Sequence, residues 1–190
     1  MGVTLKLSTR RQTLQVTVTA LLGGAVALVF LGLLAVFTGL IPANADARPS
    51  ALERWAATTS LHATLARATR GLADPLQAND RTLVEGVRLY GNNCAVCHGA
   101  ADGKPSSVAR GLYQKPPQFK KDDVTDDPVA VIYWKITHGI RLTGMPAFNE
   151  SLKDNERWAV AEFLKQQNEL PPNAEAAWRK LPSAVTDTTM

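Results

Sequence analysis

The longest run of apolar positions in the chain lies near its N-terminus, over residues 20–41. No charged residue occurs anywhere between Gln12 and Ala45. A helix over these 22 residues would be roughly 33 Å long at 1.5 Å per residue, which matches the hydrocarbon core of a bilayer. The pattern therefore predicts one N-terminal transmembrane helix.

The charges beside this run predict its orientation. Three cations precede it: Lys6, Arg10 and Arg11. Only Arg48 follows soon after, so the positive-inside rule leaves the N-terminus in the cytoplasm and places residues 46–190 on the outer side. Ala43-Asn44-Ala45 resembles a signal-peptidase site, which is the alternative, but the hydrophobic regions of signal peptides usually span only about 7–15 residues. We therefore interpret residues 1–45 as a cytoplasmic basic arm and a retained signal anchor.

Helical periodicity resumes after the apolar run. Five positions recur at helical spacing: Leu52, Trp55, Thr59, His62 and Leu65. They predict an amphipathic helix followed by a looser link, so residues 46–80 are expected to be a helical spacer. His62 is interpreted there as an exposed or capping histidine rather than a ligand.

A second helix is predicted to lead directly into a pair of cysteines. Its apolar positions are spaced i, i+4, i+7 and i+11, at Leu83, Val87, Tyr90 and Cys94. Gly86 lies on the same face, where glycine costs about 1 kcal/mol relative to alanine. Its presence indicates that another backbone or a ring approaches closely.

The remainder of the chain predicts two more helices and no strand. Residues 99–127 are rich in Gly, Pro and Asp and are expected to form a loop. Asp127-Pro128 is typical of an N-cap followed by proline at N1, and Gly139 of a helix end, so a short helix is predicted between them. A loop bearing Met145-Pro146 follows.

The last long helix is predicted to begin with a capping box formed by Ser151 and Asp154 and to end near Gln167. Pro171-Pro172 breaks it, and residues 171–190 form a C-terminal extension. A short segment over residues 173–181 is expected to pack back through Trp178. The fold class predicted from these elements is all-α.

The distribution of charge argues against nucleic-acid binding. Residues 46–190 contain 18 Lys and Arg against 17 Asp and Glu, a net charge of +1. A domain so close to neutral does not supply the basic face that nucleic acids require. The chain has only two cysteines, three positions apart, so no disulfide framework stabilises it.

Cys94-Ala95-Val96-Cys97-His98 carries the chemistry of the sequence. One turn of helix places both sulfurs where they can form thioethers with the two vinyl groups of haem, with the His98 imidazole as proximal iron ligand. A thioredoxin-like site would need a strand before the pair, and none is predicted. A zinc site would need four ligands, which only His62 and His138 remain to complete.

The chain resembles the class I c-type cytochromes. The resemblance rests on residues 90–99 (YGNNCAVCHG), on Gly144-Met145-Pro146-Ala147-Phe148 and on an aromatic terminal helix, and covers about residues 81–167. It implies a small haem domain over residues 81–170, whose first and last helices cross tightly at Gly86 and Tyr90. It also implies one covalent haem c whose porphyrin completes a core too small to be stable alone.

The resemblance implies that the sulfur of Met145 is the distal iron ligand, with His98 as the proximal one. Met1 and Met190 lie at the termini, and His138, beside Gly139, is more typical of a histidine that caps a carbonyl or contacts a propionate. Three further residues are candidates for the propionate contacts or the haem wall: Tyr113, Trp134 and Arg141.

An iron with both axial positions filled by protein favours an electron carrier over an enzyme. Because this type of haem attachment is completed outside the cytoplasm, the resemblance implies a single-pass protein of the bacterial inner membrane with its haem domain in the periplasm, exchanging single electrons with redox protein partners of a respiratory chain. Two alternatives remain: a fixed haem subunit of a membrane oxidoreductase complex, and a sensor or enzyme in which Met145 is displaced so that a gas or peroxide binds the iron. The basic stretch over residues 104–121 is a candidate docking surface, or a solvated loop paired with nearby aspartates.

Overall fold

The computed structural model describes residues 2–122 and 124–183, with side chains from Arg10 onward. Every regular element in these ranges is a helix, α1 to α8, which confirms the all-α prediction. The chain divides into two compact units, one ending at Asn44 and one beginning at Ala45.

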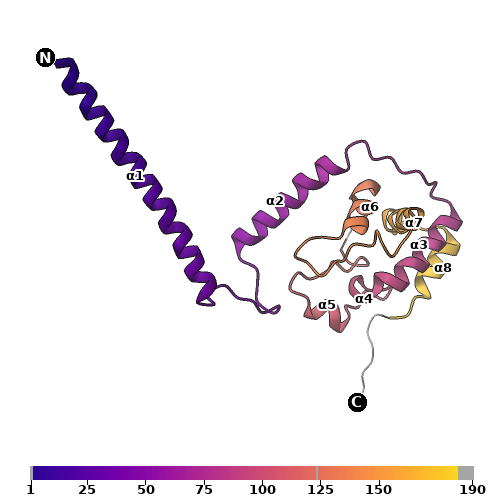
Figure 1. Ribbon diagram of the computed structural model, residues 1–190. Helices are drawn as coiled ribbons and strands as arrows, with labels where there is room; N and C mark the ends of the chain where they lie inside the picture. Colours follow the sequence, from indigo (N-terminus) through magenta and orange to yellow (C-terminus); the bar gives the residue numbers. More distant parts are fainter. Residues whose placement is uncertain (1, 123, 184–190) are drawn as a thin grey trace. The chain divides into compact units, whose positions relative to one another are not determined.

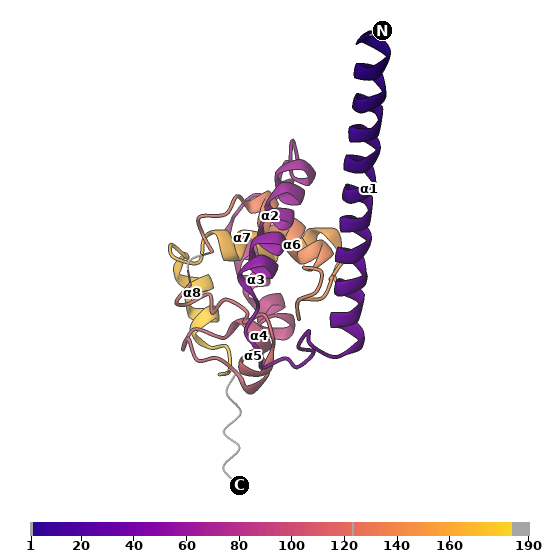
Figure 2. The same cartoon turned by 90° about the vertical axis from the view of Figure 1, so that its left-hand side faces the viewer.

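The first unit is the helix α1 (Gly2–Phe37), which is continuous in both views (Figures 1 and 2). Its segment Arg10–Phe37 is long and apolar enough to cross a membrane, and none of it is buried within the protein. The helix ends at Phe37, and the φ of 71° at Gly39 lets the N–H of Leu40 return to the carbonyl of Ala35 at 3.0 Å. This unit fits the predicted single-pass anchor.

The second unit begins with α2 (Ala51–Ala68), the predicted amphipathic helix. The hydroxyl of Ser50 caps it by accepting the N–H of Glu53 at 3.1 Å. Leu65 is buried, and the Glu53 carboxylate accepts a hydrogen bond from the hydroxyl of Tyr113 at 2.8 Å. The helix is thereby attached at both ends to the rest of its unit.

The link after α2 contacts α7 (Asp154–Lys165) through two carboxyl groups. Glu162 is buried on α7 and is hydrogen-bonded to Asp74 in the link. Burial, followed by the proximity of Asp74, raises the pKa of Glu162 to about 7. Burial beside Asp74 therefore favours the protonated form of Glu162, which can donate to a carboxylate in the link.

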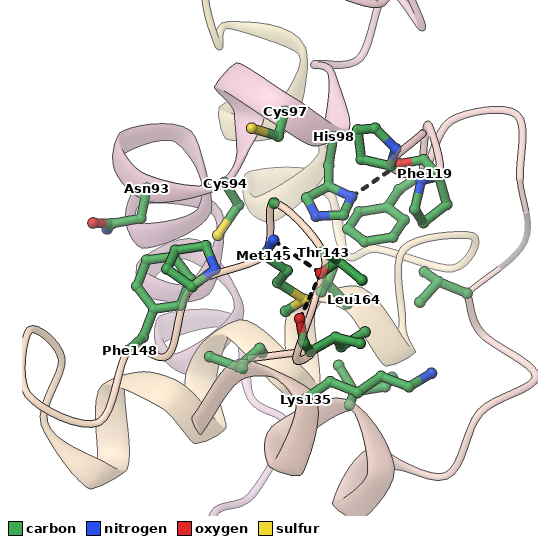
Figure 3. Close-up of a pocket in the computed structure, with 18 of the residues that line it drawn as sticks. Asn93, Cys94, Cys97, His98, Phe119, Lys135, Thr143, Met145, Phe148 and Leu164 are labelled. Carbon is green, nitrogen blue, oxygen red and sulfur yellow. Dashed lines mark hydrogen bonds between the residues drawn. The ribbon is translucent and has the colours of Figure 1, made fainter. Parts of the chain in front are cut away.

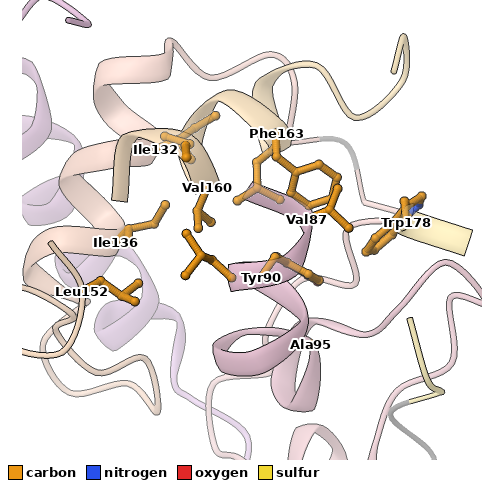
Figure 4. Close-up of a cluster of buried hydrophobic side chains, with 13 residues drawn as sticks. Val87, Tyr90, Ala95, Ile132, Ile136, Leu152, Val160, Phe163 and Trp178 are labelled. Carbon is orange, nitrogen blue, oxygen red and sulfur yellow. The ribbon is translucent and has the colours of Figure 1, made fainter. Parts of the chain in front are cut away.

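The core lies where α3 (Asp80–Asn93), α7 and α8 (Pro172–Arg179) meet (Figure 1). Three fully buried aromatic rings join the helices, with the centroid of Tyr90 5.3 Å from that of Phe163 and 5.4 Å from that of Trp178. Figure 4 shows these rings together beside Val87 and Val160. Trp178 thus packs back on the domain as its position in the sequence predicts.

Gly86 allows α3 and α7 to cross in backbone contact. A Cβ at this position would lie 2.2 Å from the carbonyl oxygen of Ala159 and 2.8 Å from the Cβ of Phe163. No side chain fits there unless the helices separate. The close approach that the sequence indicates at Gly86 is therefore an approach by α7.

The prediction of Asp127 as the N-cap of α6 (Val129–His138) is wrong. Pro128 occupies the N-cap position, and its carbonyl accepts the N–H of Val131 at 2.8 Å. Asp127 instead forms an ion pair with Lys135 at 2.5 Å. The Asp127 carboxylate therefore pairs with a lysine further along α6 instead of capping the start of the helix.

The predicted start of α7 is also displaced. Lys153 is its N-cap, and its backbone N–H donates to the carboxylate of Glu156 at 2.7 Å. The capping pair proposed for Ser151 and Asp154 therefore lies two residues further along the chain. Asp154 pairs instead with the buried guanidinium of Arg157 at 2.9 Å.

Replacing Gly86 with alanine tests the helix crossing. We expect a loss of more than about 2 kcal/mol in the free energy of unfolding, because overpacking a tight contact forces backbone to move. Gly111, which ends α5 (Ser107–Gly111), is the matched control, since nothing lies within 4 Å of its Cβ position. Urea denaturation would measure both variants. Equal stability of Gly86→Ala and Gly111→Ala would contradict the crossing described here.

Candidate functional site

A pocket of about 330 Å³ opens beside α3, α6 and α7, and all four predicted site residues line it (Figure 3). Cys94, Cys97 and His98 come from the segment where α3 passes into α4 (Ala95–His98). Met145 comes from the loop after α6. Most other lining side chains are apolar: Leu112, Pro116, Pro117, Phe119, Val124, Ile132, Ile136, Ile140, Pro146, Phe148, Val160 and Leu164.

The cysteine segment is a single turn placed by the end of α3. The N–H of Cys94 donates to the carbonyl of Tyr90 at 2.8 Å, and the N–H of His98 donates to the carbonyl of Cys94 at 2.9 Å. Gly99, with φ of 80°, ends the turn, and its carbonyl accepts the buried hydroxyl of Tyr90 at 2.7 Å. The helix that carries the core thus also fixes the position of both sulfurs.

The imidazole of His98 is held by the loop that follows it. Its Nδ1 lies 2.9 Å from the carbonyl oxygen of Pro117, which can only accept, so Nδ1 carries the proton and Nε2 keeps its lone pair. The ring stacks on Phe119 at 4.3 Å between centroids and 7° between planes. Burial lowers the pKa of His98, with the Pro117 contact opposing it. The ring is therefore suited to bind a metal as neutral imidazole.

The thiols of this pair differ from those of a redox site. Burial, with a smaller effect of Cys97, raises the pKa of Cys94 to about 12, and burial also raises the pKa of Cys97. Redox-active cysteines have depressed pKa values, because the thiolate is the reactive form. In the part of the chain that the structure describes, no three His, Cys, Asp or Glu side chains gather as they would around zinc. The geometry fits neither alternative.

Met145 is placed by a loop folded back against the end of α6. Gly139, with φ of 65°, turns the chain, and a Cβ there would lie 2.6 Å from the carbonyl oxygen of Met145. The N–H of Ile140 donates to that same carbonyl at 3.2 Å, and the N–H of Phe148 donates to the carbonyl of Ile136 at 3.1 Å. Met145 itself is half-buried against the hydrophobic core.

Several other sequence candidates lie away from the pocket. His138 and His62 are exposed, and the ring of His138 lies 4.8 Å from that of Trp134. Neither Trp134, Arg141 nor Tyr113 is among the residues that line the pocket, so the structure does not support them as wall residues. Tyr113 is instead used in its hydrogen bond to Glu53, while its neighbours Leu112 and Gln114 line the cavity.

Sequence reasoning missed two aromatic wall residues, Phe119 and Phe148. Phe119 lies in the loop after the cysteine motif, where Pro116-Pro117 was the only signal of an ordered segment. Phe148 belongs to the segment that carries the resemblance, but no periodicity assigns its side chain to the cavity. Both positions depend on loop hydrogen bonds between residues distant in the sequence.

The basic stretch over residues 104–121 is partly used within the fold. The Nζ of Lys115 donates to the carbonyls of Arg110 and Leu112 at 2.6 and 2.7 Å. Asp122 accepts the N–H of Gln118 at 2.7 Å. Lys104, Lys120 and Lys121 are exposed.

Comparison with known families identifies the region that contains this pocket. Residues 81–164 match the family described as cytochrome c oxidase, cbb3-type, subunit III. No curated protein and no solved structure gives a significant match to the chain. The matched residues begin beside the start of α3 and end within α7, so they include the crossing helices, the cysteine segment and the Met145 loop. Residues 81–164 are therefore a c-type cytochrome domain.

Proposed function

We propose that the protein is a membrane-anchored monohaem cytochrome c that transfers single electrons between a respiratory donor and acceptor. The observation that carries the proposal is the joint lining of one apolar pocket by two thiols, an imidazole and a thioether. These are the groups that attach haem c and fill both axial positions of its iron. When bound, the haem supplies one-electron exchange between Fe(III) and Fe(II).

Each group in the pocket has a role in this proposal. Cys94 and Cys97, neutral thiols on one turn, would form the thioethers. His98 would bind iron through Nε2, with its orientation fixed and its basicity increased by the carbonyl of Pro117. Met145 would supply the other protein ligand, and a thioether stabilises Fe(II) relative to a second nitrogen ligand. The apolar walls keep water from the iron.

A carrier function follows from this ligand set, because no axial position is left for a substrate. The alternative is a fixed haem c subunit of a membrane oxidase, which the family match favours because that family is described as an oxidase subunit. Purification in mild detergent separates the two. A carrier is recovered alone, whereas a subunit is recovered with the same partner chains at constant stoichiometry.

The proposed location is the bacterial inner membrane, with the haem domain in the periplasm. The support is α1, which can cross a membrane, and the excess of cations before it. Because the haem domain is near neutral, its partners are redox proteins rather than nucleic acid.

Covalent haem attachment is tested by a denaturing gel stained for haem. We expect the wild-type band to keep its stain after boiling in detergent, because thioether bonds survive unfolding. Cys94→Ser and Cys97→Ser should weaken the stain, since each removes one bond. A wild-type band that loses its stain would refute the central proposal.

Met145 ligation is tested by Met145→His and Met145→Ala, with His138→Ala as the matched control. Met145→His should lower the midpoint potential, because nitrogen stabilises Fe(III) more than a thioether does. Met145→Ala should abolish the sulfur-to-iron charge-transfer band and let carbon monoxide bind the ferrous protein, and His138→Ala should leave both unchanged. If the band instead persisted in Met145→Ala, another group would hold the sixth position. Binding of carbon monoxide by the wild type would favour the sensor alternative.

Anchoring is tested by extraction of native membranes. A retained α1 is held by burial of apolar surface, so the protein should resist high-salt washing and leave only with detergent. Replacing residues 1–45 with a cleavable signal should release a soluble domain that keeps its haem spectrum but reacts more slowly with a membrane-bound partner. A native protein whose N-terminal residue is Asp46 would show that the segment is removed.

A further inference from the structure

The loop that carries Met145 contains a side chain that bridges two of its backbone groups. The hydroxyl of Thr143 donates to the carbonyl of Ile140 at 2.7 Å and accepts the N–H of Met145 at 3.1 Å, as Figure 3 shows. The N–H of Thr143 also donates to the carbonyl of Ile140 at 3.1 Å. One hydroxyl thus connects the first residue of the turn to the methionine.

Packing contributes little to the stability of this turn. Leu142 has φ of 63°, and within the described residues it is the one non-glycine residue with positive φ. Its side chain is 90% exposed, so burial does not compensate for this strained backbone. Gly144 rests against the side chain of Leu112. The conformation therefore depends on the hydrogen bonds that close it.

We propose that Thr143 is a positioning residue that holds Met145 in the conformation in which its sulfur binds iron. This inference rests on the proposed ligation of iron by Met145. The hydrogen bond from the N–H of Met145 to the Thr143 hydroxyl fixes the backbone of Met145 and thereby the direction of its side chain. The bond from that hydroxyl to Ile140 connects the methionine to the end of α6.

The role predicts a specific defect when the hydroxyl is removed. Met145 competes with any external ligand for the sixth position, and its advantage depends on how much of the time the turn is closed. Without the hydroxyl, the N–H of Met145 and the carbonyl of Ile140 lose a partner, and the open turn becomes more populated. An external ligand then binds more tightly, although it makes no new contact.

The experiment measures imidazole binding to the ferric full-length protein in detergent, followed by loss of the sulfur-to-iron band. Thr143→Val removes the hydroxyl and keeps the shape, and Thr143→Ser restores the hydroxyl. Thr58→Val is the matched control. The Thr58 hydroxyl also donates to a backbone carbonyl, that of Arg54 at 2.8 Å, but this exposed bond lies in α2 and not in the Met145 loop. Thr143→Val should bind imidazole roughly tenfold more tightly, as expected for the loss of two ordinary hydrogen bonds.

The controls separate positioning from general destabilisation. Thr143→Ser should remain within about twofold of the wild type, and Thr58→Val should not change imidazole affinity at all. Urea denaturation of the same samples should show no loss in the free energy of unfolding of Thr143→Val that corresponds to its change in imidazole affinity, since the turn is exposed. If Thr143→Val attaches too little haem, Thr143→Ala provides the same measurement with a smaller side chain.

Two failures of this experiment are distinguishable. If Met145→Ala keeps the band and the wild-type imidazole affinity, Met145 is not the ligand and the proposed function is wrong in its axial pair. If Met145→Ala loses the band while the variants lacking the hydroxyl bind imidazole as the wild type does, only the role of Thr143 is overturned. A rise in imidazole affinity that Thr143→Ser fails to reverse would also overturn it.

Discussion

The backbone of Gly86 lies directly against the carbonyl of Ala159, and the shape of the pocket depends on this contact. α3 ends at the cysteine segment, and α7 supplies Val160 and Leu164 to the cavity wall. The distance between the two helices therefore sets the distance between the cysteine segment and the apolar floor of the pocket. Tyr90 maintains both distances, since its ring packs in the core and its hydroxyl donates to the carbonyl of Gly99.

The two sides of the pocket are stabilised in different ways. On the histidine side, the loop is held by the Pro117 carbonyl, by the Phe119 ring stacked on His98 and by the half-buried side chain of Gln118, which donates to the carbonyl of Cys97 at 3.0 Å. On the methionine side, the turn is exposed and depends on its own hydrogen bonds. Local opening costs least where few apolar contacts are lost, so ligand exchange is expected at the methionine side rather than the histidine side.

The sequence predicts those features that depend on local spacing. The periodicity that leads from Leu83 to Cys94 gives α3, and the cost of glycine in a helix indicates the contact at Gly86. The starts of α6 and α7 were misplaced because carboxylates such as Asp127 and Asp154 pair with cations on later turns, which a capping pattern does not reveal. The wall residue Phe119 could not be assigned because long-range hydrogen bonds, without any periodicity, order its loop.

The attachment of α2 to its unit, through Leu65 and through the hydrogen bond between Glu53 and Tyr113, shortens the flexible part of the chain. Only the 13 residues from 38 to 50 separate the end of α1 from the start of α2. A flexible chain of that length spans roughly 20 Å on average. In an anchored protein, the pocket would stay within a thin layer beside the bilayer. Partners embedded in the same membrane would meet it by diffusion in two dimensions, whereas a dissolved partner would reach it only by approaching that surface.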